Sequence, residues 1–388
     1  MMESTYQNIL TDSNGIVINA MENTTCPSLI WDENVTENVS RSSFMVEAYA
    51  EKIYEIYLPR VLSSSKYVRI IMYIFGYSGN LLAFMLWIRK PMLHSSGCYL
   101  AALAMSDLAF LILDLLYSLH TEWGINALNV PILCETFTIL YLTTQYTSPL
   151  LTLGFTTERY IAIKFPLKRR IYCTPKRAIT MVIFLAFLSL ALCGIQGYFW
   201  TYDKKLKECV RRIDKLEIWE SWTWSTEMVM FLAVPVMILA LNMLVISEIR
   251  KSRKIALKLH RILFKTTATT TMLLAVSFFL ILTTLPVSIA YALNYSFPPG
   301  KIHNSLLDIN EDPIWRAHLS YYEARTIIYN VGLTHYVMNF YIYLVAGDRF
   351  RKDVLIMLRC KKSARNLSRI HTRSETTKME SFCSSDTF

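Results

Sequence analysis

The hydrophobic residues of this chain fall into long blocks separated by short polar connectors. A helix rises about 1.5 Å per residue, so about 20 apolar residues cross a hydrocarbon core about 30 Å thick. Seven blocks reach that length, at approximately 68–88, 97–119, 134–157, 178–200, 223–247, 267–293 and 326–346. The pattern predicts an all-α membrane protein, a seven-transmembrane helix bundle, rather than a bundle of soluble helices.

The blocks differ in how many polar residues they contain. The first, fourth and sixth are almost uninterrupted, whereas the other four carry polar side chains, as helices do when they line a bundle interior. Composition agrees, because 53% of residues are hydrophobic and 18% are charged, against about 25% charged in globular domains.

The distribution of charge predicts the orientation of the bundle. Seven crossings place the two ends of the chain on opposite sides, and Lys and Arg favour the cytoplasmic side. The majority of the 40 basic residues fall in segments that lie inside if the amino end is outside. We therefore expect a multi-pass plasma-membrane protein with an extracellular N-terminus. The net charge of +10 indicates this topology and contact with anionic lipid, not nucleic-acid binding.

Four regions follow from this topology. Residues 1–65 form an extracellular tail without a recognisable signal peptide, and 66–346 form the bundle. Residues 347–360 form a short amphipathic helix on the membrane surface, and 361–388 a polar, disordered cytoplasmic tail. The expected modifications are glycosylation at Asn23, Asn34 and Asn38 and lipidation at Cys360, where an unmodified thiol is the alternative. Phosphates on the Ser/Thr-rich tail would attract a basic, arrestin-like partner; a merely solubilising tail is the alternative.

Three of the eight cysteines lie on the oxidising side in this topology, namely Cys26, Cys134 and Cys209. At most one intramolecular disulfide can form among them. A bond between Cys134 and Cys209 would pin the loop before the fifth block across the mouth of the bundle.

Polar groups inside the predicted spans need an explanation, because a charge there costs about 2.5–3.5 kcal/mol. Asp107 lies near the middle of the second block, and Ser148 and Asn339 offer neutral oxygens from two other blocks. Their convergence would form a small-cation site. Glu158 and Arg159 end the third block, where a local ion pair could hold the guanidinium until another partner takes it; a simple basic anchor is the alternative.

Several motifs resemble those of rhodopsin-like (class A) G-protein-coupled receptors over roughly residues 66–360. They are 79-GN-80, 103-LAxxD-107, 158-ERYIAIxxPL-167, the Cys134 and Cys209 pair, Pro235, Pro286, 339-NFYIY-343, and Phe350 in the segment after the last span. The resemblance implies a Cys134–Cys209 disulfide, a sodium site at Asp107, Ser148 and Asn339, and coupling to a heterotrimeric G protein. The residues implied in activation and coupling are Glu158, Arg159, Tyr160, Pro166, Leu167, Asn339 and Tyr343.

The chain also departs from the family pattern. Phe340 replaces the proline of the last motif, and Thr284 stands where a tryptophan is common. Thr266 stands where many members carry an acid facing the arginine, and Met243 replaces a common tyrosine. These departures indicate a divergent branch.

The expected ligand site is the outer half of the bundle. Leu333 stands where opsins carry the lysine that attaches retinal, which disfavours a light sensor. Tyr141 stands where amine receptors carry an aspartate, which disfavours a monoamine ligand. The long acidic tail, the charged loop 202–217 and a long outer loop from about 295 to 322 favour a neuropeptide. Glu227 would meet a ligand cation and Arg325 a ligand anion. The candidate contacts are Tyr117, Tyr141, Gln145, Glu227, Tyr291, Arg325 and Tyr329.

Other functions fit the sequence less well. A small organic ligand is the closest alternative to a peptide. Glu227 and Arg325 could also bond to polar neighbours within the bundle and not to a ligand. A transporter would favour internal repeats and broken half-helices, which the sequence lacks. A receptor-shaped protein that binds a ligand without activating G proteins is a third possibility. No phosphate loop, metal-ligand spacing or nucleophile elbow indicates an enzyme, and no cofactor is expected beyond a sodium ion.

Overall fold

The computed structural model describes residues 49–89, 94–204, 207–212, 215–256, 264–300, 309, 311–348 and 350–357. The predicted glycosylation sites Asn23, Asn34 and Asn38, the candidate lipidation site Cys360 and the tail 361–388 lie outside these residues.

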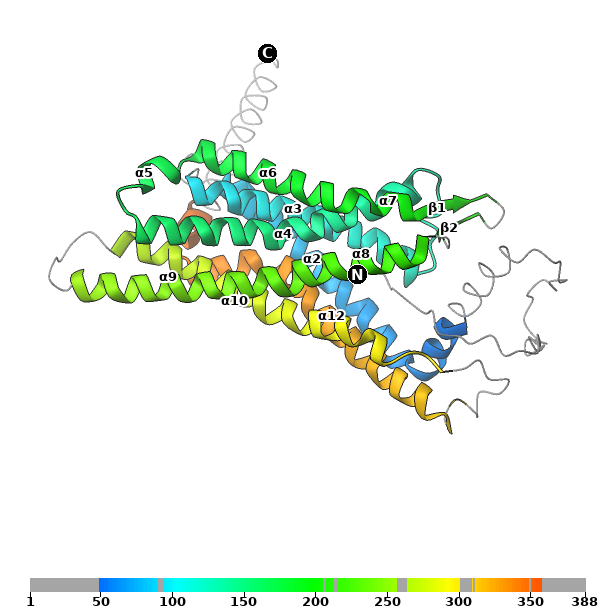
Figure 1. Cartoon of the computed structure of the whole chain (residues 1–388). Helices are drawn as coiled ribbons and strands as arrows, with labels where there is room; N and C mark the ends of the chain where they lie inside the picture. Colours follow the sequence, from blue (N-terminus) through cyan, green and yellow to red (C-terminus); the bar gives the residue numbers. More distant parts are fainter. Residues whose placement is uncertain are drawn as a thin grey trace, which may run out of the picture.

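The described residues form a bundle of seven long helical segments that run side by side (Figure 1). They are α2 (Pro59–Trp87), α3 (Ser95–Thr121), α4 (Leu133–Lys164), α6 (Pro175–Gly194), the continuous α8–η2–α9 (Leu216–Met228, Val229–Ala233 and Val234–Ala256), α10 (Phe264–Leu293) and α12 (Pro313–Ala346). Each contains or overlaps one predicted block, which confirms the all-α bundle. Short elements join them: α5 (Arg169–Tyr172), α7 (Gln196–Phe199), β1 (Trp200–Asp203), β2 (Glu208–Arg211) and the 3₁₀ turn η3 (Asn294–Ser296).

Among the described residues, five helical segments are long and apolar enough to cross a membrane. The other two, α4 and α12, are also long, at 32 and 34 residues, but carry many hydroxyl and amide side chains. Much of this polar set is buried in the bundle and not turned to lipid, as the sequence predicted for these blocks.

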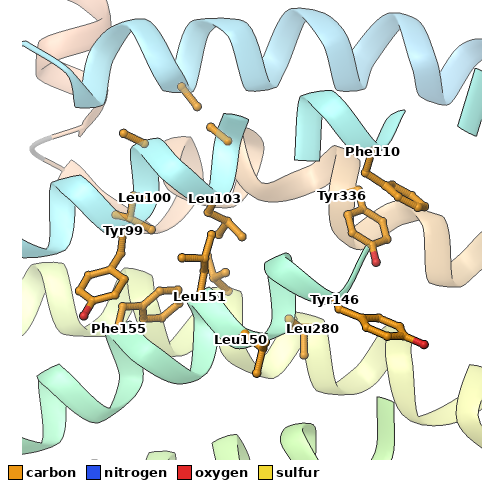
Figure 2. Close-up of a cluster of buried hydrophobic side chains, with 14 of the residues drawn as sticks. Tyr99, Leu100, Leu103, Phe110, Tyr146, Leu150, Leu151, Phe155, Leu280 and Tyr336 are labelled. Carbon is orange, nitrogen blue, oxygen red and sulfur yellow. The ribbon is translucent and has the colours of Figure 1, made fainter. Parts of the chain in front are cut away.

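The core of the bundle is built around α4, which packs against α3, α6, α9 and α10. Figure 2 shows large side chains of this core, including Phe110 on α3 and Tyr336 on α12 with their rings stacked 4.0 Å apart. The three helices α3, α4 and α12 therefore meet where most of the functional candidates lie.

The two ends of the bundle are different (Figure 1). At one, called here the hairpin end, β1 and β2 pair antiparallel with Tyr202 opposite Cys209. At the other, called the Arg159 end, α4 ends and α5 follows. The pattern of hydrophobic blocks did not predict the hairpin.

The last long helix begins much earlier than predicted, so the expected outer loop of about 295–322 is wrong over its second half. Pro313 occupies the first turn of α12, and the Asp312 Oδ1 accepts a hydrogen bond of 2.8 Å from the Ile314 backbone N–H. Asp as cap and Pro in the first turn are a standard helix start. The hydropathy pattern missed it because 313–325 is rich in charged and polar residues.

The predicted tail 1–65 also contains ordered structure, because α2 begins at Pro59 and residues 49–57 are helical. These residues pack on the start of α12 in a second, smaller core that includes Ala50, Ile53, Tyr54, Ile309 and Trp315. We call this core the cap. The Tyr54 ring stacks on Tyr322 at 3.8 Å, and its hydroxyl lies 2.8 Å from His318 Nε2.

A π-helical turn interrupts the fifth segment at η2, immediately before the first turn of α9 that contains Pro235. Proline has no N–H to continue the ladder, and π-turns accommodate such irregularities. The Ser288 hydroxyl of α10 donates a hydrogen bond to the Phe231 carbonyl inside this turn. The fifth and sixth segments are therefore joined at the point where the regular ladder is broken.

A helical segment follows α12 at 348 and 350–357, within the predicted range 347–360. Phe350 is buried there and packs against Trp87 and Tyr343, at ring distances of 5.3 and 5.4 Å. The segment is thus attached to the bundle through an aromatic contact.

Candidate functional site

The candidate residues fall into three places along the bundle: the Arg159 end, a polar centre and a cleft towards the hairpin end. The first contains the predicted ion pair. Arg159 and Glu158 are both buried, with 3.6 Å between Nη2 and Oε1. The Ser95 hydroxyl of α3 donates to the second Glu158 oxygen. Glu158 is therefore held from two helices, while Arg159 Nε has no hydrogen-bond partner within the described part of the chain.

The next predicted activation and coupling residues along the chain lie at the end of α4 and in the turn after it. Tyr160 accepts a hydrogen bond of 2.6 Å from Lys164, one turn further along α4. Pro166 and Leu167 follow in an exposed turn, where Leu167 is 91% exposed. Exposure of an apolar side chain to water is unfavourable, and no packing within the bundle compensates for it here. It is available to a partner at the Arg159 end.

Tyr343 lies near this end but is buried and does not point to solvent. Its ring packs edge-on against Trp87 at 5.6 Å, and its hydroxyl has no hydrogen-bond partner among the described residues. Phe340, which stands in place of the expected proline, packs against Phe350 at 5.7 Å. The substitution thus links α12 to the helix that follows it.

The polar centre brings together the three predicted cation ligands. The Ser148 hydroxyl donates to Asp107 Oδ1 at 2.8 Å, and the Asn339 amide donates to Asp107 Oδ2 at 2.7 Å. All three are buried. Carboxylate, hydroxyl and amide oxygens are the ligands that hard cations prefer, so the donor set fits a sodium ion. No cluster of three His, Cys, Asp or Glu suited to a transition metal occurs in the described ranges.

A cleft lies beyond this centre, towards the hairpin end, and encloses about 590 Å³ of empty space including the part open to solvent. Its lining is Arg69, Phe110, Asp114, Tyr117, Tyr141, Gln145, Phe231, Thr284, Val287, Tyr329, Gly332, Leu333, His335 and Tyr336. Four of the seven predicted ligand contacts are in this set: Tyr117, Tyr141, Gln145 and Tyr329.

The other three predicted contacts are not part of this lining. Glu227 is buried and accepts a hydrogen bond of 3.0 Å from Tyr146. Arg325 donates to Asn294 Oδ1 at 3.0 Å and lies over the Tyr322 ring at 4.8 Å. Tyr291 is buried on α10. Glu227 and Arg325 thus have polar neighbours in the bundle, as the alternative interpretation of the sequence allowed.

Two charged lining residues were not among the predicted contacts. Asp114 accepts hydrogen bonds from Tyr73 at 2.8 Å and from Tyr141 at 3.0 Å. Arg69 forms a 3.2 Å ion pair with Glu122 and donates to Asn330 at 3.2 Å. Sequence spacing could have found Asp114, because it lies seven residues, or about two turns, beyond Asp107 and so on the same face of α3.

The hairpin is fixed to the start of α4 at its end of the bundle. Cys134 at the start of α4 is bonded to Cys209 in β2, with their Cα atoms 5.5 Å apart. The Cys209 backbone N–H also donates to Asn129 at 3.1 Å. The disulfide expected from the resemblance is therefore present.

Comparison with known proteins agrees with this architecture. The model of the seven-transmembrane receptor (rhodopsin) family matches residues 79–319. The chain is 36% identical to the human thyrotropin-releasing hormone receptor over 121 residues, which cover 30% of this chain and 29% of that receptor. It is 24% identical to the Drosophila melanogaster FMRFamide receptor over 323 residues, covering 76% and 53%. It is 27% identical to the pig growth hormone secretagogue receptor type 1 over 175 residues, covering 44% of each.

Each of these matches spans less than two thirds of the relative's own length. The family match covers more than half of this chain, from the end of α2 into the start of α12, and includes Asp107, Ser148 and the Glu158–Arg159 pair. The chain therefore belongs to the rhodopsin family of seven-transmembrane receptors, multi-pass membrane proteins that are receptors and not enzymes.

Proposed function

We propose that this protein is a plasma-membrane G-protein-coupled receptor for an extracellular neuropeptide. The observation that carries the proposal is the separation of two sites in one family bundle. An open cleft lies towards the hairpin end, and a buried ion pair with an exposed leucine lies at the Arg159 end. The similar receptors from human and Drosophila melanogaster are named for thyrotropin-releasing hormone and for FMRFamide, and the second name spells an amidated peptide.

The cleft suits the end of a peptide better than a whole one. It is lined by aromatic rings, with a few polar groups among them, as ligand pockets usually are. The hairpin, fixed by the disulfide to α4, provides a peptide backbone at the mouth for the rest of the ligand. The amidated carboxyl end, which carries no charge, would then enter the cleft.

The proposed response passes through the packed helices between the two ends. Thr284 of α10 and Tyr336 of α12 line the cleft, and Asp107 joins α3, α4 and α12 below it. A ligand that favours a different packing of these helices would shift the equilibrium at the Arg159 end between the paired and the separated state of Glu158 and Arg159. The pair would then separate, and Arg159 and Leu167 would contact the G protein. A sodium ion at Asp107 would oppose this change by holding the three helices together.

Screening amidated peptides against the expressed receptor tests this function. We expect a subset of peptides to raise intracellular calcium or change cyclic nucleotide levels in cells that express the chain, and not in untransfected cells. The same peptides should drive no flux of labelled peptide across the membrane. Peptide flux without a G-protein response would indicate a transporter and contradict the proposal.

Arrestin-like binding to the phosphorylated tail belongs to the same proposal. It is supported by the Ser/Thr-rich composition of 361–388.

A further inference from the structure

The lining of the cleft contains a carboxylate that two tyrosines orient. Tyr73 on α2 donates to one oxygen of Asp114, and Tyr141 on α4 donates to the other, at 2.8 and 3.0 Å. Asp114 is 4% exposed. A carboxylate has about four lone-pair sites, so each oxygen can accept a further hydrogen bond. The tyrosines fix the carboxylate in position without neutralising its charge.

The charges around this carboxylate do not balance. Within the described lining, Arg69 is the residue that carries a full positive charge, and its 3.2 Å ion pair is with Glu122. Arg69 also interacts electrostatically with Asp114, but their charged groups are not in direct contact. One guanidinium thus faces two carboxylates. Two carboxylates that share one guanidinium leave an excess negative charge away from water, which is costly, so the site favours a cation from the ligand.

Two further side chains in the lining have unused acceptor atoms. His335 Nδ1 lies 2.8 Å from the Gly332 carbonyl, which can only accept, so this nitrogen carries the proton. Its Nε2 then accepts, and it has no hydrogen-bond partner among the described residues. The Gln145 Oε1 is likewise buried and unpartnered. A buried acceptor that stays unpaired is unfavourable, so both atoms favour a ligand that brings hydrogen-bond donors.

We infer that the cleft receives a guanidinium group of the peptide ligand, with Asp114 as its counter-ion. This inference rests on the proposed function and names the chemistry of its ligand. A guanidinium offers five N–H donors in a planar fork, which suits a carboxylate and additional neutral acceptors better than the three donors of an ammonium. Its flat face also stacks well on aromatic rings such as Tyr141 and Tyr336, which line the same cleft.

We therefore assign the contact with the ligand cation to Asp114. The sequence had suggested Glu227 for this contact. Glu227 is buried against Tyr146 and is not part of the described cleft lining. The two carboxylates lie on different helices, α8 and α3, so mutation can separate their roles.

Two matched libraries of amidated tetrapeptides test the inference. One contains arginine at each position in turn, the other contains citrulline in its place, and neither contains lysine. Citrulline keeps the shape of arginine but is neutral. G-protein activation is compared for the wild type, Asp114→Asn and Glu227→Gln at equal surface levels, measured with an N-terminal epitope tag. Asp114→Ser is the second variant if Asp114→Asn does not reach the surface.

We expect the arginine library to activate the wild type at concentrations at least about 30-fold lower than the citrulline library, the effect of losing one partner of a desolvated charge pair. Asp114→Asn should reduce this ratio to less than about threefold, and Glu227→Gln should preserve it. Equal activation of the wild type by both libraries would leave the peptide receptor intact but overturn the guanidinium site. Loss of the ratio in Glu227→Gln and not in Asp114→Asn would overturn the assignment to Asp114. Activation by neither library would contradict the proposed function itself, and the inference would fall with it.

Discussion

Arg159→Ala is expected to reduce peptide-stimulated G-protein activation to the basal level while the receptor still reaches the cell surface. Arg159 is buried at the end of α4 and its one ion pair among the described residues is with the adjacent Glu158. In the proposed active state it is the cation that leaves this pair and contacts the G protein. Loss of one partner of a desolvated charge pair costs about 2–5 kcal/mol, or at least about 30-fold in an equilibrium.

The matched control for this variant is Lys164→Ala. Lys164 is a basic residue near the same end of α4, but it is exposed and bonded to Tyr160. We expect Lys164→Ala to retain activation within about threefold, since exposed charge contacts contribute about 0–1 kcal/mol. Nucleotide exchange in membranes with equal receptor content is the measurement. Normal nucleotide exchange with Arg159→Ala would show that the Arg159 guanidinium is not needed for G-protein activation.

Trp315→Ala is expected to detach the helix at 49–57 from α12. Trp315 is 1% exposed in the cap, where its ring contacts Tyr49 at 6.1 Å and His318 at 5.6 Å. Removing a buried tryptophan costs about 3–5 kcal/mol. Because the cap has a separate small core, this loss should open it locally rather than unfold the bundle.

Hydrogen exchange measures this effect directly. In Trp315→Ala, amides of 49–57 should exchange about 100-fold faster or more, while those in the middle of α4 keep their protection. Trp224→Ala is the control, because Trp224 lies on α8, is 41% exposed and is not part of the cap. Unchanged exchange at 49–57 in Trp315→Ala would show that the cap does not hold this segment.

The sequence predicted the bundle because transmembrane helices are specified by a strong, local signal. Length and hydropathy located every long helix, but four of the seven segments (α2, α4, α8–η2–α9 and α12) extend seven residues or more beyond the predicted block, into more polar sequence. The first part of α12 is such a case, since its stability comes from Trp315 and Tyr322 packing against the distant segment 49–57. No local pattern contains that contact.

The convergence at the polar centre was also predictable, because Asp107 and Asn339 belong to motifs of the resemblance and Ser148 offers a hydroxyl from the third block. The lining of the cleft was less predictable from the sequence. The rotation of α8 depends on the π-turn at η2, which changes the phase of the residues before it relative to those after it. Glu227 lies two residues before this turn, so its direction could not be inferred from regular helical spacing.

The roles of the cleft and of Arg159 require that the two ends of the bundle face opposite sides of the membrane, with the hairpin end outside. Labelling of introduced cysteines with a membrane-impermeant maleimide on intact cells measures this. Ile125 near the hairpin end is 52% exposed and Leu167 near Arg159 is 91% exposed. Relative to the wild type, which keeps Cys26 outside in this topology, we expect Ile125→Cys to gain label on intact cells and Leu167→Cys to gain label only after permeabilisation. Labelling of Leu167→Cys on intact cells, with Ile125→Cys protected until permeabilisation, would contradict the orientation and the receptor mechanism built on it.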